Sequence, residues 1–428
     1  MKISPALAPL LLALIRPATA QTQAPTPAPR VSARMVQGMV NRVLKETSVL
    51  RELSIKRPVK SGVQTRAQVE AMIGRQLKSS VSSAELGASQ LFLRQLGLAP
   101  SNFDLRSSYT RLLGEQVAGY YDSKTGAFYT SDRISPGELE IVMSHELTHA
   151  LQDQHFDLSR LDKWPRHDSD AKLAMSALVE GDATLVMSRY MTRNPLRVLG
   201  VMMSAFKPQS DTAVFRSTPR LLRETLLFPY IQGLSFTTNL YGNGGWPRVS
   251  GAFTRLPQST QQVMHFDKYL ARKAPVMIPL RDARPRLGAG WQLLDHDVDG
   301  ELGSTLVLGE FLTDKSEVDN ATKGWAGDRY AVYGGPKNSA LVVQDGLWDS
   351  ESAARLWRDA YAKRTSLRFG KRAKVQQRGA LCVWNVAPNG VWMERRGRRV
   401  VILEGTVGAF NPASVLALVW RSGGSKMS

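Results

Sequence analysis

The chain has a single cysteine, Cys382, among its 428 residues. An intramolecular disulfide is therefore impossible, even in a compartment that oxidises thiols. Long apolar runs are also missing, because no segment after the first twenty residues approaches the roughly 20 apolar residues needed to cross a bilayer. We therefore expect a mature chain without a transmembrane segment, whose stability comes from packing and not from cross-links.

Acidic residues are scarce relative to basic ones. The chain has 37 Asp and Glu against 56 Lys and Arg, a formal net charge of +19. Such an excess favours anionic partners, such as membrane surfaces or phosphate-rich envelope polymers, although a dispersed basic face can also serve solubility alone. Long uninterrupted Lys/Arg runs are absent, so we expect no specific nucleic-acid partner.

The N-terminus has the pattern of an export signal. Lys2 supplies a short positive region, residues 6–15 (ALAPLLLALI) are apolar, and Ala18-Thr-Ala20 is a small-x-small cleavage pattern before Gln21. The apolar run is too short to span a membrane. We therefore expect a signal peptide over residues 1–20 and a periplasmic or secreted protein, followed by a Pro-rich linker over 21–30.

The strongest local signals lie in the first half of the chain. Residues 116–131 alternate around a Ser-Lys-Thr-Gly turn and predict a β-hairpin. Directly after it, Ser135 and Glu138 form a capping box with Pro136 at the first helical position, which predicts a helix to about residue 156. Apolar periodicity predicts a second helix over residues 171–191.

The second half of the chain has a different pattern of predicted elements. Residues 241–247 (YGNGGWP) are rich in glycine and predict a loop, and Ser259 is expected to cap a helix that continues through Tyr269. Beyond Trp325, short β-rich runs alternate with helices. We expect an α+β fold with a larger catalytic domain over residues 31–300 and a smaller α+β region over 301–428.

The motif that carries chemistry is His145-Glu146-Leu-Thr-His149, inside the capped helix. Residues i and i+4 lie on the same face of a helix, so both imidazoles can reach one ion. His145 and His149 are therefore candidate Zn²⁺ ligands. Glu146 lies about 100° around the helix from His145, where it can act on water beside the metal as a general base.

Two residues compete to be the third ligand. His155 has the spacing of a longer HExxHxxGxxH signature, but Gln152 stands where that signature needs glycine. An unbroken helix would carry His155 about 15 Å along its axis from His145. Glu180, on the second helix among Leu, Val and Ala, is the better candidate, because a buried carboxylate requires a partner.

Other acidic residues are weaker candidates. Asp153 lies one turn after His149 and, like Asp182, could accept the second ring N–H of a ligating histidine. Residues 295–300 (DHDVDG) resemble the opening of a calcium-binding loop, but Leu306 stands where the bidentate glutamate is needed, so we interpret them as a polar turn.

The motif around His145 and the segment around Glu180 (VEGDA) resemble the gluzincin branch of the zincin metallopeptidases. The resemblance extends, more narrowly, to a group of bacterial HExxH proteins and covers most of the mature chain. It implies a zincin-like catalytic domain whose edge strand, here from residues 116–131, pairs with an extended peptide. Tyr230 and His265 are candidates for the side chain that stabilises the transition state.

These observations predict an exported zinc metallopeptidase acting on a peptide or protein. Two alternatives remain open. One is a metal-dependent hydrolase of another amide or ester in the cell envelope, which would use the same site. The other is a non-catalytic, basic envelope-binding protein in which the HExxH helix is a relic.

Overall fold

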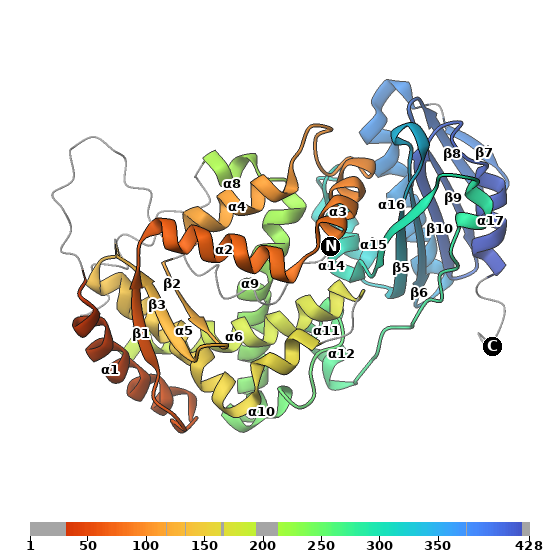
Figure 1. The fold of residues 1–428 in the computed structure, drawn as a ribbon. Helices are drawn as coiled ribbons and strands as arrows, with labels where there is room; N and C mark the ends of the chain where they lie inside the picture. Colours follow the sequence, from red (N-terminus) through yellow and green to blue (C-terminus); the bar gives the residue numbers. More distant parts are fainter. Residues whose placement is uncertain are drawn as a thin grey trace.

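Two sheets of different construction organise the chain into two lobes (Figure 1). The structure is a computed structural model. It describes residues 31–116, 118–132, 134–163, 167–193, 213–373 and 375–421. The expected signal peptide (1–20) and linker (21–30) lie outside the described residues. Within the described part, no helix is both long and apolar enough to cross a membrane.

The N-terminal lobe is mainly helical and contains the smaller sheet. Its strands are β1 (Lys60–Gln64), β2 (Gly119–Asp122) and β3 (Ala127–Ser131), in the order β1-β3-β2, with β1 parallel and β2 antiparallel to β3. Its helices are α1 (Ala33–Arg51), α2 (Arg66–Ser80), α3 (Ser83–Gln95), α4 (Leu105–Gln116), α5 (Pro136–Phe156), α6 (Ser169–Arg193), α8 (Ala213–Ser217), α9 (Arg220–Gly242), α10 (Gly245–Ala252), α11 (Thr260–Met264) and α12 (Phe266–Leu270).

The C-terminal lobe is built on a seven-stranded antiparallel sheet in the order β4-β5-β6-β10-β9-β8-β7. The strands are β4 (Gln292–Asp297), β5 (Trp325–Gly334), β6 (Ala340–Trp348), β7 (Val375–Arg378), β8 (Leu381–Val386), β9 (Asn389–Arg396) and β10 (Arg399–Thr406). The helices are α13 (Arg284–Leu287), α14 (Gly300–Gly309), α15 (Lys315–Thr322), α16 (Glu351–Phe369) and α17 (Pro412–Trp420). The fold is thus mixed α+β, as expected, and β4 lies within the range 31–300 that the sequence assigned to the catalytic domain.

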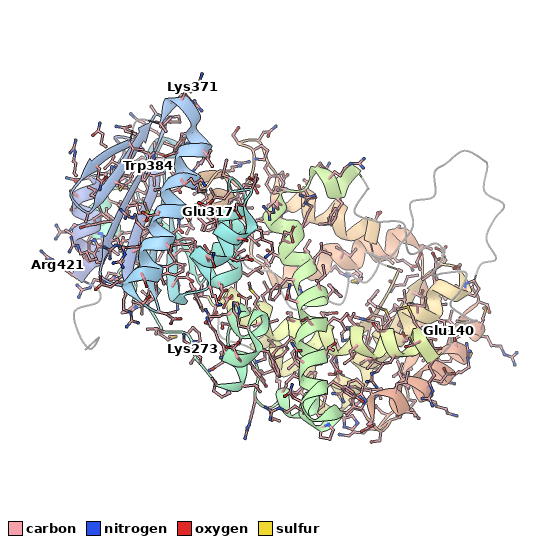
Figure 2. All side chains as sticks on the ribbon, turned by 180° about the vertical axis from the view of Figure 1, so that it is seen from behind. Glu140, Lys273, Glu317, Lys371, Trp384 and Arg421 are labelled. Carbon is pink, nitrogen blue, oxygen red and sulfur yellow. The ribbon has the colours of Figure 1, made fainter. Side chains whose placement is uncertain are left out.

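Strand β10 shows why this sheet is buried on both faces. Val400 and Ile402 point to the face that α16 covers, whereas Val401 and Leu403 point to the face that α17 covers. Successive side chains of a strand alternate between faces, so an unbroken apolar run requires a layer on each side. Figure 2 shows Trp384 within this lobe and Glu140 in the other.

Helix α1 packs against the outside of the N-terminal lobe. Ser32 caps it by accepting a hydrogen bond from the Met35 N–H, and its apolar face is buried against α5. Arg51, in its last turn, is wholly buried. A buried guanidinium requires partners, and these lie near the candidate site described below.

Two expectations for the middle of the chain were wrong. The glycine-rich segment 241–247 is almost entirely helical, with only residues 243 and 244 between α9 and α10. Gly244 and Gly245 have positive φ values of 149° and 65°, so they break the helix without opening a loop. Ser259 does cap a helix, but that helix ends at Met264, and a new one begins after the extended residue His265.

Candidate metal centre

The beginning of α5 is fixed by its own sequence. The Ser135 hydroxyl accepts from the Glu138 N–H, and the Glu138 carboxylate accepts from the Ser135 N–H, with Pro136 in the first turn. This is the expected capping box, and it satisfies two N–H groups that the helix leaves unpaired. The helix then continues without interruption to Phe156, as expected.

Helix α6 brings a carboxylate to the two histidines of α5. The Glu180 Oε2 atom lies 3.0 Å from His145 Nε2 and 3.4 Å from His149 Nε2, and the two Nε2 atoms are 3.0 Å apart. All three side chains are at most 1% exposed. Among the described residues, these three form a cluster whose ligand atoms converge closely enough to hold a metal ion.

The position of Glu180 depends on a close crossing of α6 with α9. Gly181 lies against the backbone of Gly233, and a Cβ atom added at Gly181 would be 2.1 Å from the Gly233 carbonyl oxygen. Only glycine allows two helix backbones to approach so closely. The crossing therefore sets where the carboxylate next to Gly181 lies.

Burial and mutual attraction shape the electrostatics of the cluster. Burial lowers the pKa of His145 to about 4. Burial also disfavours charge on His149, but the Glu180 carboxylate outweighs it and raises the pKa of His149 to about 9. Burial would raise the pKa of Glu180 as well, yet His149 and then His145 hold it at about 2. Without a metal, the cluster thus keeps a proton on His149 against an ionised Glu180, and a cation would replace that proton.

Glu146 lies beside the cluster and is held by the small sheet. Its Oε2 atom accepts a hydrogen bond of 2.9 Å from the Tyr121 backbone N–H. Its Oε1 atom is buried and has no hydrogen-bond partner within the described part of the chain, as is also true of His145 Nδ1 and Glu180 Oε1. Burial raises the pKa of Glu146 to about 8. Buried polar atoms without partners indicate that water or an ion is needed here.

His155 and Asp153 face away from the cluster. The His155 Nε2 atom lies 2.7 Å from the Ser54 carbonyl oxygen. Asp153 was a candidate for orienting a ligating histidine, but it does not contact one: its carboxylate accepts from the Tyr121 hydroxyl and from Arg57. The i+4 position shares the face of His149, but the second ring nitrogen of His149 turns instead toward the i+3 residue, Gln152.

Gln152 is the neighbour that the sequence analysis missed. Its Oε1 atom lies 2.8 Å from His149 Nδ1, and its Nε2 atom donates to the Val179 carbonyl and to Asp182 Oδ2. Asp182, named as a possible orienting group, therefore reaches His149 only through Gln152. The position was noted only as the place of a missing glycine, although a polar residue one turn after a candidate ligand is itself a signal.

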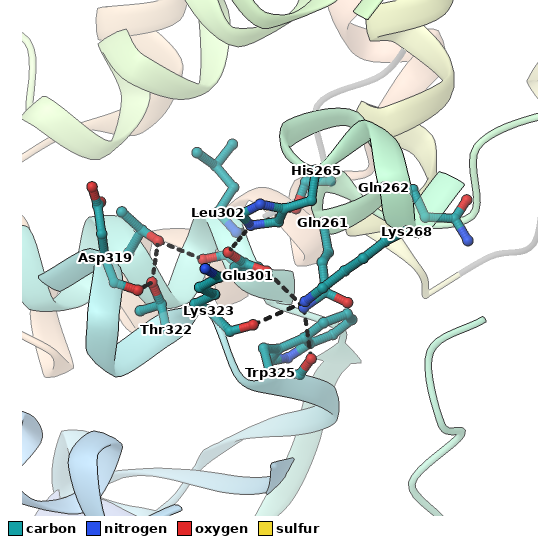
Figure 3. Close-up of polar contacts among 12 residues, drawn as sticks. Gln261, Gln262, His265, Lys268, Glu301, Leu302, Asp319, Thr322, Lys323 and Trp325 are labelled. Carbon is teal, nitrogen blue, oxygen red and sulfur yellow. Dashed lines mark hydrogen bonds and ion pairs between the residues drawn. The ribbon is translucent and has the colours of Figure 1, made fainter. Parts of the chain in front are cut away.

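Of the two candidates for a transition-state donor, one lies at the cluster and the other belongs to a different network. The Tyr230 ring stacks on the His145 ring, with centroids 6.1 Å apart, so it lies at the cluster. The His265 ring is instead bound to Glu301, with Nε2 2.6 Å from Oε1, and Gln261 links the same carboxylate to the Trp325 carbonyl (Figure 3). This separate network gives no support to His265 as a donor.

Comparisons with known proteins contribute little beyond this geometry. Residues 291–412 match a domain of unknown function, DUF8575. No curated protein matches the chain. A crystal structure from Chloroflexus aurantiacus, described as a hydrolase candidate with a novel fold, is 16% identical and covers 63% of this chain and 97% of its own, with a TM-score of 0.32. That score is too low for an argument about fold or function.

The DUF8575 region begins just before the segment that resembles a calcium loop. Asp297 ends β4 and accepts from Ser169, at the start of α6, and Gly300 begins α14 with a positive φ of 75°. Asp170, also at the start of α6, accepts from the Thr260 N–H. Asp297 and Asp170 therefore bind N–H groups at helix starts. Residues 295–300 end β4 and begin α14, and Asp297 links them to the start of α6 in the other lobe.

Proposed function

We propose that this protein is a zinc-dependent hydrolase of the gluzincin type, with His145, His149 and Glu180 as ligands. The observation that carries the proposal is the convergence of two imidazole nitrogens and one carboxylate oxygen at 3.0–3.4 Å. Ligands about 2.0–2.2 Å from a common tetrahedral centre are themselves separated by about 3.3–3.6 Å, so the two separations of 3.0 Å need to widen by only a few tenths of an ångström to hold the ion. Three protein ligands leave the fourth position for water or substrate, as in catalytic zinc sites.

The residues fit a metal for a second reason. A site of wholly buried carboxylates and imidazoles would be costly without a partner for its charge. The chain instead leaves Glu180 Oε1 and Glu146 Oε1 without hydrogen bonds among the described residues. His₂Glu is a donor set that suits Zn²⁺, since imidazole and carboxylate are both ordinary zinc ligands.

Glu146 is the proposed general base. A zinc ion held by the three ligands would supply Lewis acidity, by polarising the scissile carbonyl and acidifying water. Glu146 would take a proton from the attacking water and pass it to the leaving amine. The Tyr121 N–H fixes one carboxylate oxygen, so the other remains available for this transfer. Tyr230, stacked on His145, is the candidate for stabilising the developing oxyanion.

We propose a peptide or protein as the substrate. Strand β2 pairs only with β3 in the described sheet, so its other edge is unpaired. The Tyr121 N–H on that edge points to Glu146, and the unpaired edge therefore faces the catalytic helix. An extended peptide can add to such an edge through backbone hydrogen bonds, which would carry its scissile bond past the base.

The test combines metal content and turnover. The purified mature protein should contain about one zinc per chain, and it should cleave unstructured casein unless a chelator is present. Glu146→Gln should keep the zinc and lose hydrolysis by at least about 10²–10⁴-fold, because it removes the base and no ligand. Zinc without casein cleavage would favour another amide or ester substrate, and no zinc at all would refute the proposal.

The location of this activity is also proposed. The signal pattern before Gln21 supports export. Without Lys2 and Arg16 the exported chain keeps a net charge of 19 − 2 = +17, which would bring it to anionic envelope surfaces. Substrate and surface would then meet the enzyme in the same compartment.

A further inference from the structure

The hydrogen bonds behind His149 form a buried chain that ends on α1. His149 Nδ1 contacts Gln152 Oε1, Gln152 Nε2 contacts Asp182 Oδ2 at 2.9 Å, and Asp182 Oδ1 contacts Arg51 Nε at 2.6 Å. Gln152, Asp182 and Arg51 are wholly buried. Four side chains from three helices, far apart in the sequence, thus meet in one line behind a single candidate ligand.

Arg51 anchors the far end of this chain. Besides Asp182, it donates to the Ser250 hydroxyl at 3.2 Å, and its guanidinium lies 4.5 Å from the centroid of the Trp246 ring. Asp182 forms a buried ion pair with Arg51, and a carboxylate paired in this way can only accept hydrogen bonds.

The donor and the acceptor of every hydrogen bond between His149 and Arg51 are therefore determined. Gln152 faces two groups that can only accept, Asp182 and the Val179 carbonyl, so its amide nitrogen must point to them. Its carbonyl oxygen must then point to His149, whose Nδ1 can only be the donor. A neutral imidazole with Nδ1–H has its lone pair on Nε2, the atom that faces His145 and Glu180.

We infer that Gln152 is a positioning residue which, held by Asp182 and Arg51, fixes His149 in the tautomer that presents Nε2 to the metal. The inference rests on the proposed zinc site. The sequence led us to consider a carboxylate as the partner of His149. An amide orients the His149 ring equally well but does not place a second negative charge next to this ligand. The carboxylate of Asp182 stands one side chain farther away.

Two single variants and one double variant test the direction of these bonds, with zinc affinity measured by competition with a chelating dye. The two single variants break it. Gln152→Met keeps the length of the side chain but cannot accept from His149. Asp182→Asn must present an amide N–H either to Arg51 or to Gln152, and both are donors. Each should weaken zinc binding about 10–100-fold, the usual effect of removing the partner of a metal-bound histidine.

The double variant Gln152→Glu/Asp182→Asn restores the direction of the chain. The new carboxylate accepts from His149 and from the asparagine N–H, while the asparagine oxygen accepts from Arg51. Only the hydrogen bond to the Val179 carbonyl is lost, so the recovery should be incomplete. Zinc affinity should recover to within about tenfold of wild type, a rescue that a merely structural role would not produce. The absorption spectrum of the Co²⁺-substituted double variant should likewise return to that of the wild type, whereas the single variants should differ.

Gln154→Met is the matched control. Gln154 is on the same helix and is also buried, and its amide bonds the backbone of Lys56 and Arg57 on the side away from the metal. It should lower the melting temperature of the metal-free protein as Gln152→Met does, yet leave zinc affinity within about threefold of wild type. Equal zinc loss in both variants would overturn the inference.

Failure of this inference differs from failure of the proposed function. If the wild type binds no zinc, or binds zinc that His145→Ala does not remove, the proposed metal site itself is wrong. If the wild type binds zinc there but the single variants bind it equally well, or the double variant binds no better than either single one, only the role of Gln152 is refuted. If Gln152→Met does not fold, Asp182→Asn and the double variant still decide the question.

Discussion

Replacing Gly181 by alanine should disturb both the stability of the fold and the metal site. The added methyl would lie 2.1 Å from the Gly233 carbonyl oxygen and 2.7 Å from Thr237 Oγ1, whereas Cβ contacts below 3.0 Å are essentially never seen. Helices α6 and α9 must therefore separate by about 1 Å. Overpacking of this kind costs about 1–3 kcal/mol or more, while Gly→Ala inside a helix gains at most about 1 kcal/mol. The obstacle is helix backbone, which cannot rotate away as a side chain can, so the clash should dominate.

We expect Gly181→Ala to lower the free energy of unfolding by about 1–2 kcal/mol in urea titrations. Displacement of Glu180 by a large fraction of an ångström should also weaken zinc binding at least about tenfold, since metal sites tolerate only about 0.5 Å. Gly87→Ala is the control, because Gly87 is exposed in α3 and nothing lies within 4 Å of the added methyl. It should stabilise the protein by about 0.5–1 kcal/mol. If Gly181→Ala behaves like Gly87→Ala, the reasoning about the helix crossing is refuted.

Three further predictions concern the ligands, an acidic pair and the N-terminus. Glu180→Ala should remove most of the bound zinc, whereas His155→Ala should leave the zinc content unchanged, as measured by mass spectrometry of the native protein. Loss of zinc in His155→Ala but not in Glu180→Ala would show that His155 is the third ligand. Burial, and then the Asp328 carboxylate, raise the pKa of Asp299, so the folded state holds this proton to higher pH than the unfolded chain and stability falls as pH rises through that window. Asp299→Asn should therefore raise the melting temperature more at pH 8 than at pH 4, and an equal rise at both would contradict this. Mass spectrometry of the protein recovered outside the cytoplasm should find a chain beginning at or near Gln21, and an intact Met1 would defeat the export proposal.

Local chemistry made parts of the fold predictable. The capping box at Ser135 and the turn between β2 and β3 need only neighbouring residues, and both elements lie where the sequence placed them. Helix α4 was missed although Asp104, just before it, bonds the Ser107 N–H in the manner of a cap. The glycines near residue 244 were misinterpreted because the same residue can open a loop or merely break a helix, and packing decides between them.

The candidate site was only partly predictable for a similar reason. The spacing of His145 and His149 follows from helix geometry alone, and Glu180 stood out as an acidic residue among apolar ones. The chain through Gln152 could not be found this way, because it depends on Arg51, which is far away in the sequence. A series of hydrogen bonds that spans three helices leaves no periodic pattern in the sequence.

The contacts at the start of α6 have a consequence for how the protein matures. Asp297, in the C-terminal lobe, binds the Ser169 N–H and hydroxyl at the beginning of the helix that carries Glu180. During synthesis, Asp297 emerges from the ribosome long after both histidines and Glu180. The N-terminal end of the helix that carries Glu180 is therefore held in place only when most of the chain has been made. A nascent chain should acquire its metal late, and a truncation that ends before β4 should yield a protein that captures zinc poorly even though it retains every ligand.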